Sequence, residues 1–111
     1  ITDAPVDNQG KGEAFSPTDL VASALGSCML TIMGITANTQ NINIDGTSAR
    51  VKKVMGEDPR RISEIHLDIT FIQTLSDKHR AVLERAAHHC PVSKSLHPDL
   101  KEVVTFHYPE E

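Results

Sequence analysis

The feature that most constrains the fold is an uncharged segment, residues 20–44, whose first part, residues 20–37, is mostly apolar. Its length reaches that of a membrane-spanning helix. Serine, threonine and glycine residues dilute its apolar character, however, and the rest of the chain is typical of a globular partner for a helix. We therefore expect a buried helix of a folded domain and no membrane partner.

Local signals fix where this helix begins. Ser16 can cap it, Pro17 suits the first helical position, and Asp19 complements the positive end of the helix dipole. We expect the helix to span residues 17–38. One stripe of residues at helical spacing is apolar: Val21, Ala24, Leu25, Cys28, Ile32 and Ile35. Four more apolar residues extend the surface around this stripe: Leu20, Ala22, Met29 and Met33.

A helix that is apolar nearly all round needs cover on nearly every side. The remaining elements are few. We expect strands over residues 47–55, 65–71 and 103–108. We also expect a helix that begins at residues 76–77 and is ended by Pro91, and a short helix over residues 91–96. This order predicts a single α+β domain spanning residues 1–111. Because these elements cannot cover the long helix alone, we expect a homodimer.

The net charge and the first residues of the chain bear on its partners and its localisation. The net charge is −4 and no run of Lys or Arg is present, which argues against a nucleic-acid partner and against binding to a membrane surface. The chain starts at Ile1 rather than Met, and residues 1–17 hold no apolar core of a signal peptide. We expect a cytoplasmic protein whose N-terminal part is incomplete here.

The two cysteines are the candidate reactive residues. One interpretation is that both are small core residues, since free cysteine is among the most buried residue types. The local sequence favours a thiolate at Cys90, which precedes a short helix and follows His88 and His89. Cys28 lies in the middle of the long helix and would need a cation from elsewhere in the fold to become a nucleophile.

A metal site is not expected. The chain has no Cys-x-x-Cys pair and no His-x3-His pair, and the adjacent His88 and His89 diverge on a helix. The other histidines singled out, His66, His97 and His107, are expected at the surface.

Two stretches together resemble a known family. Residues 15–29, Phe-Ser-Pro-Thr-Asp-Leu-Val-Ala-Ser-Ala-Leu-Gly-Ser-Cys-Met, resemble the cysteine-helix motif of the osmotically inducible protein C / organic hydroperoxide resistance (OsmC/Ohr) family. Residues 89–96, His-Cys-Pro-Val-Ser-Lys-Ser-Leu, resemble its second motif, a cysteine followed by proline and a short helix. The resemblance covers roughly residues 15–108 and has both motifs in the right order.

The resemblance implies an α+β fold with an antiparallel sheet, a long buried central helix and an intertwined homodimer with active sites at the subunit interface. It implies a cysteine-based peroxidase acting on organic hydroperoxides, with hydrogen peroxide as a second candidate substrate. By this analogy Cys28 is oxidised to a sulfenic acid and Cys90 resolves it as a disulfide. An external dithiol reduces that disulfide, and neither metal nor organic cofactor is needed.

Two departures from the family pattern bear on this reading. The family's thiolate is typically held by an arginine from an N-terminal strand, and this chain has no arginine before Arg50. The best-characterised peroxidases of the family carry a glutamate early in this helix; here the nearest acid is the shorter Asp19, nine residues and about 13.5 Å before Cys28, too far to touch it along the helix. Asp19 would act through a loop or at the other subunit's site. The alternative is a non-enzymatic OsmC-like dimer or small-ligand-binding protein with structural cysteines.

Overall fold

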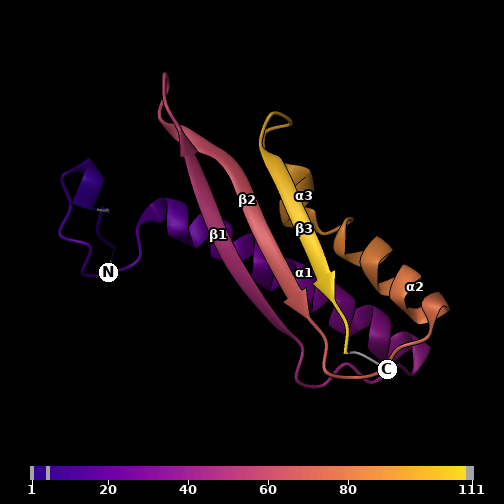
Figure 1. The fold of residues 1–111 in the computed structure, drawn as a ribbon. Coiled ribbons are helices and arrows are strands. Elements are labelled where there is room, and N and C mark those ends of the chain that lie inside the picture. The colour runs from indigo at the N-terminus through magenta and orange to yellow at the C-terminus, as the bar shows by residue number, and fades with distance from the viewer. Residues whose placement is uncertain (1, 5, 110–111) are drawn as a thin grey trace.

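A sheet covered on one face by helices forms the body of the protein (Figure 1). The computed structural model describes residues 2–4 and 6–109. After a single 3-10 turn, η1 (Val6–Asn8), the order is α1 (Pro17–Gln40), β1 (Ser48–Gly56), β2 (Arg61–Thr70), α2 (Asp77–Ala87), α3 (Pro91–Ser95) and β3 (Lys101–His107). The predicted α+β class and every predicted helix and strand are confirmed, with ends that differ by a few residues.

The three strands lie in the order β1-β2-β3. β1 and β2 form an antiparallel hairpin, whereas β3 runs parallel to β2. The expectation of an antiparallel sheet is therefore wrong for its third strand, and the sheet is mixed. The reason is the connection: α2 and α3 form a crossover that returns the chain to the starting end of β2, so that β3 must run in the same direction.

The start of α1 follows the sequence signal closely. Ser16 Oγ accepts a hydrogen bond from the Asp19 N–H at 3.1 Å, and the Asp19 carboxylate accepts one from the Ser16 N–H at 3.1 Å. This reciprocal arrangement is a capping box. Lys53 of β1 also donates to Ser16 Oγ, at 3.0 Å, so that the edge strand holds the first turn of the helix.

The face of α1 that forms the core differs from the predicted stripe. The helix buries one line of residues against the sheet and α2: Ala22, Leu25, Gly26, Met29, Met33 and Ala37. Val21 and Ile35, which belong to the predicted stripe, are 37% and 59% exposed, and Leu20 is 47% exposed. Periodicity alone could not choose between the two lines, because both are apolar and only contact with the sheet decides which is covered.

Gly26 fixes how closely α1 approaches the sheet. A Cβ atom at this position would lie 2.7 Å from the Cγ2 atom of Val51 in β1.

By length and composition α1 could cross a membrane, but a third of its most apolar window is buried inside the domain, and the core helix of a soluble protein meets the same criteria.

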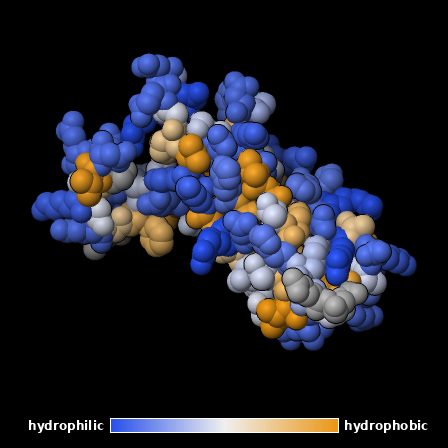
Figure 2. Space-filling model, viewed as in Figure 1, coloured by the Kyte–Doolittle hydropathy of each residue, from blue (hydrophilic) through white to orange (hydrophobic). Residues whose placement is uncertain are grey.

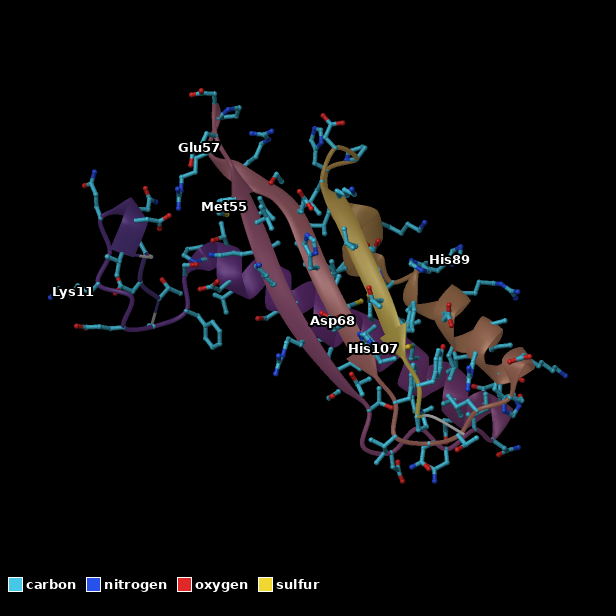
Figure 3. All side chains as sticks on the ribbon, viewed as in Figure 1. Lys11, Met55, Glu57, Asp68, His89 and His107 are labelled. Carbon is cyan, nitrogen blue, oxygen red and sulfur yellow. The ribbon has the colours of Figure 1, made fainter. Side chains whose placement is uncertain are left out.

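The outer face of the sheet is polar. Figure 2 shows hydrophilic residues over most of this side of the molecule. His107 Nε2 lies 2.8 Å from Asp68 Oδ1, and Figure 3 shows these two side chains together on the sheet. The side chains of His66, His97 and His107 are 39%, 73% and 48% exposed, which confirms their predicted place at the surface.

Replacing the capping serine should weaken the whole domain. We expect Ser16→Ala to lower the free energy of unfolding by about 1–2 kcal/mol, because the Asp19 N–H and the Lys53 ammonium lose an acceptor. Urea unfolding measures the change. Thr39→Ala, at an exposed position in the last turn of the same helix, is the control and should be close to neutral. Equal losses in the two variants would show that the cap contributes nothing special.

A candidate two-cysteine site

Cys28 lies midway along α1, at the border between the covered and the uncovered sides of the helix. Its side chain is half-buried and packs against the hydrophobic core. The neighbouring residues on either side differ sharply, since Ser27 is exposed and Met29 is fully buried. The thiol therefore stands at the edge of the core rather than in its middle.

Cys90 is the N-cap residue of α3. Proline at the next position disfavours helical geometry at Cys90, which has φ −74° and ψ 147°, so that α2 cannot continue through it. Its Sγ atom accepts a hydrogen bond from the Ser93 N–H at 3.3 Å. The residue is completely buried. The predicted short helix after Pro91 is confirmed, and it is this helix that fixes the direction of the thiol.

The structure brings the two thiols together from distant parts of the sequence. Burial raises the pKa of the Cys90 thiol, and the Ser93 N–H opposes this effect; the side chain of Cys28 and the charge of Glu102 raise the pKa further. Cys28 is thus a direct neighbour of Cys90, across the contact between α1 and α3. Two thiols placed in this way can exchange between a dithiol and a disulfide.

The expected influence of the two histidines on Cys90 is wrong. The rings of His88 and Phe106 form an edge-to-face pair with centroids 6.0 Å apart. His89 is exposed, and its Nδ1 atom lies 2.7 Å from the Arg85 carbonyl oxygen, with the side chain pointing away from the body in Figure 3. Burial therefore dominates, and the pKa of Cys90 rises instead of falling.

Sequence reasoning missed two residues beside Cys90. The hydroxyl of Ser93 lies 2.9 Å from both carboxylate oxygens of Glu102. Glu102 pairs in register with Ile65, which is fully buried under the helices, so that the acid occupies the covered face of β3. One signal was present in the sequence: Glu102 shares the alternating face of Val104 and Phe106, where an apolar residue would be expected.

Asp19, the third predicted site residue, lies at the start of α1. Its Oδ1 atom is 2.9 Å from Lys53 Nζ, which also donates to Thr18 Oγ1 at 2.6 Å. The hydrogen bond from Lys53 and that from the Ser16 N–H lower the pKa of Asp19. Its ionised form therefore stabilises the fold at neutral pH, and this contribution is lost as the pH falls through its pKa. The carboxylate is about two and a half helical turns before Cys28.

Within residues 2–4 and 6–109, no group of three or more His, Cys, Asp or Glu side chains is placed to hold a metal ion. What the described residues do assemble is a pair of neighbouring thiols with a serine and a carboxylate behind one of them.

Comparison with known proteins places this arrangement in a family. Residues 10–103 match the sequence model of the OsmC-like proteins. A crystal structure from Psychrobacter arcticus, of a protein named as an osmotic stress induced and detoxification response protein, is 60% identical and superposes with a TM-score of 0.91, covering 96% of this chain and 77% of that one. No curated protein gives a significant match.

More distant structures share the fold. An organic hydroperoxide resistance protein OsmC from Legionella pneumophila is 18% identical, with a TM-score of 0.80 over 95% of this chain and 78% of that one. The organic hydroperoxide resistance protein OhrB of Bacillus subtilis is 21% identical, with a TM-score of 0.65 over 84% of this chain and 70% of that one. From the match over residues 10–103 together with the 60% identical structure, the chain belongs to the OsmC family of proteins.

Proposed function

We propose that this protein is a thiol-dependent peroxidase of the cytoplasm that reduces organic hydroperoxides, with Cys28 as the peroxidatic and Cys90 as the resolving residue. The observation that carries the proposal is the direct proximity of these two thiols, one half-buried and one fully buried. Membership of the OsmC family supports it. So do the names of distant relatives, which are hydroperoxide resistance proteins.

The chemistry needs only the two sulfur atoms and an external dithiol. The Cys28 thiolate attacks one oxygen of the hydroperoxide; the O–O bond breaks, the alcohol leaves after taking a proton, and Cys28 becomes a sulfenic acid. The Cys90 sulfur then attacks the Cys28 sulfur, and the sulfenic hydroxyl leaves with the Cys90 proton as water. A dithiol reduces the resulting disulfide by exchange and is itself oxidised.

The unequal burial of the thiols supports this assignment of roles. A hydroperoxide has to reach the sulfur that attacks it, and Cys28 is the thiol at the edge of the core. Cys90 has no exposed surface, and its raised pKa keeps it a thiol at neutral pH. A buried thiol suits a residue whose only reaction partner is another side chain.

We further propose that the active form is a homodimer in which a second copy covers the uncovered side of α1. Leu20, Val21 and Ile35 are exposed apolar residues on this side. An interface that covered them would remove their remaining exposed apolar area from water, which stabilises an association by roughly 25 cal/mol per Å². The active sites would then lie where the two copies meet, because Cys28 borders the same side.

Substitution of each cysteine should have a different result. We expect Cys28→Ser to abolish consumption of cumene hydroperoxide in the presence of a dithiol. Cys90→Ser should allow one turnover and then accumulate sulfinic acid at Cys28, because no resolving thiol remains. Mass spectrometry of each cysteine distinguishes these states, and Ser27→Ala is the matched control. Full activity in both cysteine variants would refute the peroxidase and favour structural cysteines.

The proposed catalytic part of Asp19 can be separated from its part in holding α1. Asp19→Asn and Lys53→Met both break the ion pair between strand and helix. Lys53→Met also removes the bonds to Ser16 and Thr18, so its loss in unfolding free energy should be at least as large. If Asp19 acts on the reaction at the site of a second copy, Asp19→Asn slows hydroperoxide consumption more than Lys53→Met does. Equal rates in the two variants would limit Asp19 to the helix start.

The dimer can be tested at the exposed side of α1. We expect the unmodified protein to sediment as a dimer and Ile35→Asp to sediment as a monomer, because an unpaired charge at an apolar interface is costly. Ile72→Asp is the control: Ile72 is exposed to a similar extent, 62% against 59%, but lies outside α1. A monomeric unmodified protein would overturn the proposed assembly.

A further inference from the structure

Glu102 is a carboxylate on the side of β3 that the helices cover. Its register partner Ile65 has no exposed surface, and Val104 and Phe106, which share its face, pack against the core. A charge in such a place loses hydration, and this cost has to be offset by hydrogen bonds. An acid at this position therefore needs a specific partner.

Ser93 is that partner, and it also contacts the buried thiol. Its hydroxyl lies 2.9 Å from each oxygen of the Glu102 carboxylate and donates to it. Its backbone N–H donates to Cys90 Sγ at 3.3 Å. One residue thus links the acid of β3 to the thiol at the start of α3.

This link matters because α3 is too short to be a stable helix by its own hydrogen bonds. The helix comprises only Pro91–Ser95, and a single turn is unstable without tertiary contacts. The hydrogen bond from Ser93 to Glu102 attaches this turn to β3, and with it the direction in which Cys90 Sγ points. The negative charge of Glu102 also acts on the thiol, since it raises the pKa of Cys90 in addition to the effect of burial.

We propose that Glu102, acting through Ser93, is a positioning residue that holds the Cys90 thiol beside Cys28 and places a negative charge near it. The inference rests on the proposed function. While Cys90 is neutral it is a poor nucleophile and does not compete for hydroperoxide. Once Cys28 is a sulfenic acid, an electrophilic sulfur lies beside Cys90; the Cys90 sulfur attacks it as its proton is lost, the S–S bond forms, and that proton leaves with the displaced hydroxyl as water.

A thiol titration tests the effect of the charge without any peroxide. In a Cys28→Ser background, Cys90 is the only cysteine, and its ionisation is followed by the ultraviolet absorbance of the thiolate. Burial remains the largest influence on its pKa, and beside burial the Ser93 N–H and the Glu102 carboxylate act on it. We expect Glu102→Gln, which keeps an acceptor for Ser93 but removes the charge, to lower the midpoint.

Glu64→Gln is the control for this titration, because Glu64 pairs with His66 on β2 and is not among the groups that act on Cys90. Its midpoint should equal that of the background protein. An unchanged midpoint in Glu102→Gln would overturn the proposal. This titration is independent of activity, so that it decides the part of Glu102 even if the protein consumes no hydroperoxide.

A second measurement tests positioning in the chain with both cysteines. After excess cumene hydroperoxide, mass spectrometry gives the ratio of Cys28–Cys90 disulfide to Cys28 sulfinic acid. We expect Ser93→Ala to lower this ratio about tenfold, as for the loss of one hydrogen bond to a charged group. Ser93→Thr, which keeps the hydroxyl, should restore it.

Ser95→Ala serves as the control in this second measurement, since Ser95 is an exposed residue of α3 that bonds only to the Pro91 carbonyl among the contacts described. Its ratio should match that of the unmodified protein. A normal ratio in Ser93→Ala would refute the positioning role. If the unmodified protein forms neither product, the peroxidase assignment fails. The titration then decides alone whether the charge of Glu102 acts on the Cys90 thiol.

Discussion

The packing of one face of α1 on the sheet and on α2 is the contact on which the rest of the structure depends. Leu25, Met29 and Met33 are fully buried in one hydrophobic core, which also contains the inward side chains of β2 and Leu83 of α2. Burial of each such side chain contributes about 1.5–3 kcal/mol. Because this contact fixes the rotation of α1 about its axis, it also decides that Cys28 borders the core, that it can meet Cys90, and that a second apolar line remains uncovered.

The sequence predicts this fold best where local chemistry decides. The beginning of α1 at Ser16 and Pro17 and the break at Pro91 follow from capping and from the geometry of proline, which need no information about distant residues. The rotation of α1 and the direction of β3 were not predictable in the same way. The first depends on which of two apolar lines meets the sheet, and the second on the path of the connection through α2 and α3.

The same division applies to the candidate site. Both cysteines could be selected from the sequence because they are rare and because their flanking motifs resemble a family. The pairing of Ser93 with Glu102 could not, since it joins a short helix to a strand across the fold. The prediction that His88 and His89 favour a thiolate at Cys90 was wrong for a related reason. Adjacency in sequence does not fix where a side chain points, and burial raises the pKa of Cys90.

Lys53 ties β1 to the first turn of α1 through several polar contacts. Its amino group bonds to three residues of that turn, Ser16, Thr18 and Asp19, from a strand at the edge of the described sheet. An edge strand presents backbone groups that another strand can pair with. A strand that paired there would join β1 directly and, through the Lys53 amino group, would be linked to the first turn of the cysteine-bearing helix.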